Sequence, residues 1–126
     1  MQHRFVVKEL SIVNHDLNSK TPFQIKPSFS KKISKLSDEE YEVAIKVEFK
    51  NTAENPFPFD LIATIALITK IEGTIDEKTL DDYLNKNCVQ ILFPYLRSSV
   101  TSLTSASLMT PLVLPIIDAS NFKTAE

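Results

Sequence analysis

The chain has 126 residues, of which 43% are hydrophobic and 24% charged, and its formal net charge is −2. This length fits a single domain spanning residues 1–126, and the charge balance suggests neither nucleic acid nor an anionic membrane as a ligand. The single glycine, Gly73, excludes a glycine-rich nucleotide site, because a P-loop needs two glycines and a dinucleotide fingerprint three. We therefore expect no cofactor.

Two strands are expected before residue 34. Apolar residues alternate over 5–13, and the alternation changes phase near Lys8, which predicts a strand with a bulge. Apolar positions also alternate over 23–33, where Pro27 predicts an edge position or an irregular stretch.

Two further strands follow. Residues 41–49 place apolar side chains at every odd position, with Glu42, Lys46 and Glu48 on the other face, which is typical of a half-buried antiparallel strand. Residues 57–72 form a longer strand that is apolar on both faces, with Ile62, Ala66 and Ile68 on the second face. This run is too short to span a bilayer as a helix, so no membrane insertion is expected.

After Gly73 the period becomes helical. Asp76 is the expected N-cap of a first helix, and residues 85–87 are expected to interrupt it. A second, longer helix then carries one face made of Cys88, Leu92, Tyr95, Ser99 and Leu103.

The end of the chain is predicted to be extended. Residues 105–115 are apolar but hold two prolines, which favours an arm over a helix, and residues 118–126 allow one helical turn at most. The sequence thus predicts an α+β domain: a four-stranded antiparallel sheet, one long helix, an extended proline-containing arm and a short C-terminal tail.

Few residues suggest catalysis or metal binding. His15-Asp16 has no cysteine or second histidine at ligand spacing, so it is read as a surface pair. Cys88 lies on the apolar helix face and is read as a core residue. We expect neither an enzyme nor a metal site. A lone cysteine and the lack of a basic leader before an apolar run favour a reducing compartment and a cytoplasmic location.

Apolar surface exceeds what one sheet and one helix can bury, and exposed patches of this kind mark interaction sites. Two uses are open and compatible: subunit interfaces, or a groove for unfolded client chains. The expected client-binding residues are Phe57, Phe59, Leu61, Leu96, Leu108, Met109, Leu112, Leu114 and Ile116. The expected oligomer interface comprises Phe5, Val7, Tyr95, Ser99 and Leu103.

Such a groove would accept many sequences, because apolar burial is non-directional and each large side chain contributes on the order of 1.5–3 kcal/mol. Several weak contacts along one client would add up by multivalency without ATP.

Three blocks, at 71–73 (Ile-Glu-Gly), 91–97 (Ile-Leu-Phe-Pro-Tyr-Leu-Arg) and 111–115 (Pro-Leu-Val-Leu-Pro), resemble the signature of the SecB family of bacterial protein-export chaperones. The resemblance implies an ATP-independent holdase that binds unfolded preproteins, forms a dimer of dimers and passes clients to the motor ATPase SecA. It also implies that dimers pack through the face around Tyr95 and Ser99.

The chain departs from that pattern at two places. The tail after Pro115 is short, so the second helix of the family is expected to be reduced or missing. The strand glutamate through which the family docks SecA falls beside Phe59. Two alternatives therefore stay open: a SecB-like chaperone dedicated to the antitoxin of a toxin–antitoxin pair, and a non-enzymatic hydrophobic-ligand-binding domain.

Overall fold

The structure is a computed structural model, and it describes residues 2–15, 26–54, 56–109 and 111–124. The strands are β1 (Gln2–Asn14), β2 (Ser28–Lys35), β3 (Glu40–Phe49), β4 (Phe59–Lys70) and β5 (Lys123–Thr124). The helical elements are α1 (Glu77–Asp82), the π-helical turn η1 (Tyr83–Asn87), α2 (Cys88–Ala106) and the 3₁₀ turn η2 (Ala119–Asn121).

The strands form one sheet in the order β1-β4-β3-β2-β5. The first four pair antiparallel, as predicted, and the register of β1 on β4 shifts between Val7 and Glu9, which confirms the bulge expected near Lys8. On β3 and β4, every second side chain is buried over most of the strand, on the face that the helix covers. The predicted α+β class is therefore confirmed.

Two details of the sheet differ from the sequence prediction. Pro27 precedes β2 instead of lying inside it, because β2 begins at Ser28; Phe23 and Ile25 lie outside the described residues. The tail adds a fifth strand, which the sequence did not predict. Lys123 and Thr124 pair parallel with Ser30 and Lys31, so β5 covers two residues of the β2 edge.

The helix was expected to break at residues 85–87, and this prediction was wrong. Asp76 caps α1 by accepting a hydrogen bond from the backbone N–H of Thr79 at 3.4 Å, but the helix then runs on to Ala106 through η1. In η1 the N–H of Cys88 bonds to the carbonyl of Tyr83, five residues back. Leu84 within this turn and Cys88 directly after it are both buried, while residues 86 and 87 are exposed.

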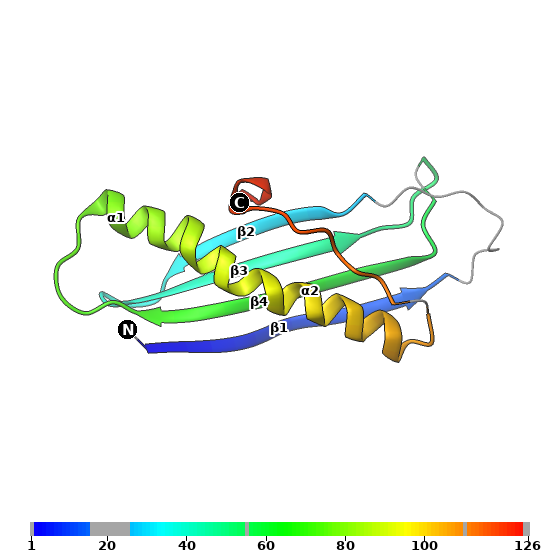
Figure 1. Cartoon of the computed structure of the whole chain (residues 1–126), viewed down its shortest axis with the longest axis horizontal. Coiled ribbons are helices and arrows are strands. Elements are labelled where there is room, and N and C mark those ends of the chain that lie inside the picture. Colours follow the sequence, from blue (N-terminus) through cyan, green and yellow to red (C-terminus); the bar gives the residue numbers. More distant parts are fainter. Residues whose placement is uncertain (1, 16–25, 55, 110, 125–126) are drawn as a thin grey trace.

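Helix and arm lie on the same face of the sheet (Figure 1), with α2 crossing it diagonally and the arm of residues 111–118 returning towards β2. The buried residues of α2 are Cys88, Val89, Leu92, Phe93, Leu96, Val100 and Thr104. The reading of Cys88 as a core residue is confirmed, since its side chain is fully buried. No described helix or arm covers the opposite face of the sheet.

Candidate functional site

Three side chains of α2 hold the arm against the helix. Arg97 Nε donates to the carbonyl of Leu114 at 2.7 Å, and Thr101 Oγ1 donates to the carbonyl of Leu112 at 2.8 Å. Thr104 Oγ1 in turn accepts the N–H of Leu112 at 2.9 Å. Residues spaced by four and then three positions share one helix face, so α2 presents a ladder of polar groups to an extended backbone. We call Arg97, Thr101 and Thr104 the arm ladder.

Side chains of the arm alternate between the core and the exterior. Leu114 is 1% exposed and Leu112 is half-buried, whereas Val113 is 59% and Ile116 81% exposed. At the end of α2, Leu108 is 96% exposed. Leu108, Val113 and Ile116 therefore project from the helix–arm layer; we call these three the outer apolar row.

The predicted client-binding residues divide into two groups in the structure. Only Leu108 and Ile116 are exposed, and Met109 and Leu112 are half-buried against the core. The remaining five are at most 4% exposed and belong to the hydrophobic core of this chain: Phe57, Phe59, Leu61, Leu96 and Leu114.

Packing around the start of β4 explains that burial. The rings of Phe49 and Phe57 stack with their centroids 5.3 Å apart, and Phe57 lies 4.8 Å from Phe59. The sequence prediction required Phe57 and Phe59 to be exposed, whereas both are buried in this chain. Direct client contact by this group would require core side chains to separate, so the accessible candidate surface is the outer apolar row.

Beside that row lies an open groove between α2 and the arm. It has a volume of about 440 Å³ and is lined by Pro94, Arg97, Ser98, Thr101, Ser102 and Val113. Sequence reasoning missed the roles of Arg97 and Thr101. The spacing of Arg97, Thr101 and Thr104 was a visible signal, but their partners are backbone groups of the arm, which no side-chain pattern reveals.

Most of the predicted oligomer residues lie together where β1 meets the same stretch of α2. Phe5 on β1 and Tyr95 on α2 have ring centroids 4.9 Å apart, and each side chain is about half exposed, at 45% and 54%. Val7 is 58% exposed, and Ser99 lines the same hollow of about 190 Å³. Leu103 is half-buried and packs against the core instead of lining that hollow.

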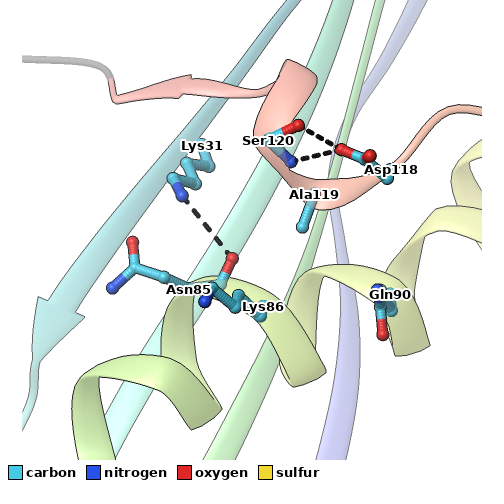
Figure 2. A pocket seen from close by; sticks show the side chains of 7 residues that line it. All are labelled: Lys31, Asn85, Lys86, Gln90, Asp118, Ala119 and Ser120. Carbon is cyan, nitrogen blue, oxygen red and sulfur yellow. Dashed lines mark hydrogen bonds between the residues drawn. The ribbon is translucent and has the colours of Figure 1, made fainter. Parts of the chain in front are cut away.

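A polar hollow of about 320 Å³ lies where η1, β2 and η2 meet (Figure 2). Lys31 Nζ lies 3.5 Å from the carbonyl oxygen of Asn85, and the Asp118 carboxylate accepts from the backbone N–H of Ser120 at 2.7 Å and from its hydroxyl. The Ser120 hydroxyl and N–H hold the pKa of Asp118 below its ordinary value. Because these polar groups bond to one another, the hollow reads as a structural junction of helix, sheet and tail.

Reactive groups are few in the described part of the chain. Burial raises the pKa of the Cys88 thiol, so the thiolate needed of a nucleophile is disfavoured. Burial likewise raises the pKa of Tyr83, whose hydroxyl shares a hydrogen bond of 3.2 Å with Thr69. No cluster of three or more potential metal ligands occurs among residues 2–15, 26–54, 56–109 and 111–124.

His15 pairs with the start of β4. Its Nε2 lies 3.0 Å from Asp60 Oδ2, and its backbone N–H donates to the carbonyl of Pro58 at 2.9 Å. The expected partner Asp16 lies outside the described residues. This pair ties the end of β1 to the β3–β4 connection. Across the described ranges, no helix is long and apolar enough to cross a membrane.

The comparisons with known proteins agree with this architecture. The family model described as "Preprotein translocase subunit SecB" matches residues 2–124. The protein-export protein SecB of Orientia tsutsugamushi (strain Boryong) is 30% identical over 118 residues, which cover 89% of this chain and 73% of that protein. The SecB of Saccharophagus degradans is 33% identical over 87 residues, covering 68% of this chain and 51% of that protein.

Two solved structures share the fold. The Mycobacterium tuberculosis Rv1957 SecB-like chaperone, in complex with a ChAD peptide from the Rv1956 HigA1 antitoxin, matches with a TM-score of 0.71 at 18% identity, over 92% of this chain and 90% of that one. A Streptococcus agalactiae protein of unknown function matches with a TM-score of 0.52 at 11% identity, over 91% and 96%.

An antiparallel sheet covered on one face by a long helix and an extended apolar arm is the SecB-like fold. With a family model matching 2–124, the chain belongs to the SecB family.

Proposed function

We propose that this protein is an ATP-independent holdase that binds extended, apolar segments of unfolded polypeptides along the outer apolar row. The observation that carries the proposal is the arm itself. The arm is an extended apolar segment whose backbone carbonyls accept hydrogen bonds from Arg97 and Thr101. The same layer that holds the arm leaves Leu108, Val113 and Ile116 in solvent.

Physical chemistry makes such a surface tolerant of sequence. Apolar burial requires no particular side-chain geometry, so clients of many sequences can contact the outer apolar row. Leu108, Val113 and Ile116 each offer on the order of 1.5–3 kcal/mol on full burial. A client that also meets a second copy of this row in an oligomer gains further by multivalency.

Oligomerisation belongs to the same proposal. Phe5, Val7 and Tyr95 form an exposed apolar patch on β1 and α2, and β1 is an edge strand over its whole length. An exposed, long edge strand with apolar side chains is an aggregation hazard unless it is covered. A second copy that covers this edge, in a dimer of dimers as the family resemblance implies, would remove the hazard and place several outer rows in one particle.

Two kinds of client are supported to different degrees. Relatives at about 30% identity are named protein-export protein SecB, which favours proteins destined for export as clients; SecA as the receiving partner is what the family resemblance implies. The mycobacterial structure of the same fold holds a peptide from an antitoxin, which favours a dedicated client. A small hydrophobic ligand is less well supported, because Leu114 and Phe122 already fill the space beneath the arm and tail.

The test is light scattering of two unrelated, chemically unfolded proteins diluted into buffer with this protein and without ATP. We expect suppression of aggregation at near-stoichiometric ratios. The variant Val113→Asp with Ile116→Asp should lose this suppression, because charge on the outer row opposes apolar burial. Leu114 is not a suitable position for this test, since a buried aspartate would unfold the core.

A matched control is Leu36→Asp with Ile75→Asp. These apolar side chains are 50% and 37% exposed but lie away from the arm. Equal suppression by both double variants would refute the outer row as the client surface. Suppression of neither unfolded protein, together with tight binding of one antitoxin peptide, would instead establish the dedicated chaperone.

A further inference from the structure

We propose that the helix-free face of the sheet carries a docking site for an acidic, extended segment of a partner protein, separate from the client surface. The site is a hollow of about 270 Å³ across β2, β3 and β4. Small side chains line its floor and lysines its rim: Ser30, Ser34, Ala44, Thr64, Lys32 and Lys46. We call it the lysine hollow.

Strand register puts the two lysines on the same face. Lys32 pairs with Ala44, whereas Lys46 pairs with Ser30 on β2 and with Thr64 on β4. The two ammonium groups therefore stand diagonally, one strand apart and two residues along. The two lysines thus bring like charges to neighbouring positions on one exposed face.

The lysines lack internal partners. Neither Lys32 nor Lys46 makes an ion pair or a hydrogen bond with any residue that the structure describes. The carboxylate that lines the hollow, Glu42, is engaged by Lys8, whose Nζ lies 3.2 Å from both of its oxygens. Glu48 lies two residues beyond Lys46 on the same face but outside 4 Å of its ammonium. The hollow thus presents positive charge within a chain of net charge −2.

Geometry favours a polypeptide over a small anion. Diagonal cross-strand positions are roughly 7–8 Å apart along the sheet. Side chains at alternate positions of an extended peptide are separated by about 6.6 Å, twice the rise per residue of a strand. Two carboxylates spaced by one residue therefore match the two ammonium groups, and the hydroxyls of Ser30, Ser34 and Thr64 can donate to the same carboxylates. Lysine clusters facing acidic segments gain from electrostatic complementarity.

The centre of this face holds two ammonium groups without an internal partner and a Glu42 carboxylate that is paired with Lys8. The partner of this face is therefore expected to carry the opposite charge, as Asp or Glu at alternate positions.

The experiment uses the full chain and two fluorescein-labelled peptides of equal composition. One alternates Glu with Ser, and the other places its glutamates in adjacent pairs. Fluorescence anisotropy should show tighter binding of the alternating peptide, weakening as salt is added. Lys32→Gln with Lys46→Gln should weaken that binding by about tenfold, because two charge pairs are lost. The control Lys35→Gln with Lys78→Gln removes two exposed lysines elsewhere and should change affinity by less than about twofold.

Site mapping completes the test. Amide NMR shifts on peptide addition should centre on Ser30, Ser34 and Thr64 and spare Val113. The proposal fails if the chain does not bind the alternating peptide, if it binds both peptides equally, or if the control double variant loses as much affinity. It also fails if inorganic phosphate or anionic vesicles displace the peptide from the same lysines at comparable charge concentration. Unchanged suppression of aggregation by the Lys32/Lys46 variant would show that the two surfaces act separately.

Discussion

Leu108 adopts a backbone conformation that suits glycine. It is a non-glycine residue with positive φ, at 61°, and 96% of its side chain is exposed. The N–H of Leu108 donates to the carbonyl of Ser105 at 3.1 Å, and the N–H of Met109 donates to the carbonyl of Thr104 at 3.1 Å. These two bonds form a Schellman motif at the end of α2. An exposed leucine at this position breaks two local preferences, as expected of a residue kept for binding.

We expect Leu108→Gly to raise the free energy of unfolding by about 0.5–1 kcal/mol, because relief of the left-handed strain exceeds the entropy cost of glycine. Urea denaturation measures this gain. Leu108→Ala keeps the strain and should show no gain. If Leu108 binds clients, the glycine variant will be more stable yet poorer at suppressing aggregation. A destabilised glycine variant would contradict the strain argument.

Asp60 gives a pH dependence at the same scale. The N–H of Asn51, at 2.7 Å from Oδ1, is the largest cause of a lowered pKa for this carboxyl, and His15 adds to it. A lowered folded-state pKa means that the ionised form stabilises the fold above the unfolded-state value of about 4, and that this contribution is lost as the pH falls through the folded-state value.

Asp60→Asn should therefore be less stable than the natural chain at neutral pH, and the difference should shrink below about pH 4. Because the Asp60 side chain is 40% exposed, the gap should stay below about 1 kcal/mol. Urea unfolding at a series of pH values measures it. Asp38→Asn, the same substitution at an exposed turn, is the control. A stability difference between the natural chain and Asp60→Asn that grows as the pH falls would contradict the lowered pKa of Asp60.

The arm is the element whose position depends most on side-chain hydrogen bonds. Thr104 is fully buried; its hydroxyl donates to the carbonyl of Val100 at 2.9 Å and accepts the N–H of Leu112 at 2.9 Å. Leu114 then fills the core while Val113 faces solvent. This ladder sets the register of the arm and hence which of its side chains a client can reach.

Thr104→Val should lower the free energy of unfolding by about 1–3 kcal/mol, because it leaves the N–H of Leu112 without its partner. Hydrogen exchange should quicken at Leu112 and Leu114 while β3 stays protected. Ser102→Ala removes an exposed hydroxyl one helix position beyond Thr101 and serves as the control. Unchanged exchange in the arm of the valine variant would show that apolar packing alone holds it.

At the scale of the whole molecule, apolar surface is distributed unequally between the two sheet edges. β5 covers part of the β2 edge, whereas β1 is bare among the described strands and carries Phe5 and Val7 beside Tyr95. The helix crosses the sheet diagonally and leaves this corner uncovered (Figure 1). Association of copies is the most economical way to bury it.

We expect Phe5→Glu with Tyr95→Glu to convert an oligomer of the natural chain into a monomer that remains folded, because both side chains are about half exposed and the core is untouched. Analytical ultracentrifugation measures the mass, and circular dichroism checks the fold. Leu36→Glu with Ile75→Glu should leave the mass unchanged. A monomeric natural chain, or an unchanged mass in the first variant, would refute this interface.

The sequence by itself determined the element order, the bulge near Lys8, the Asp76 cap and the core role of Cys88, because these depend on periodicity and on local chemistry. The motif blocks also determined the family. Tertiary structure alone decided which apolar residues stay exposed. The sequence alone does not separate the buried residues Phe57, Phe59 and Leu114 from the exposed residues Val113 and Ile116, because all five are apolar. Packing against β3 and the arm ladder buries the first three and leaves the other two exposed. Burial depends on partners distant in the chain, and so does the pairing of Lys32 and Lys46 across strands.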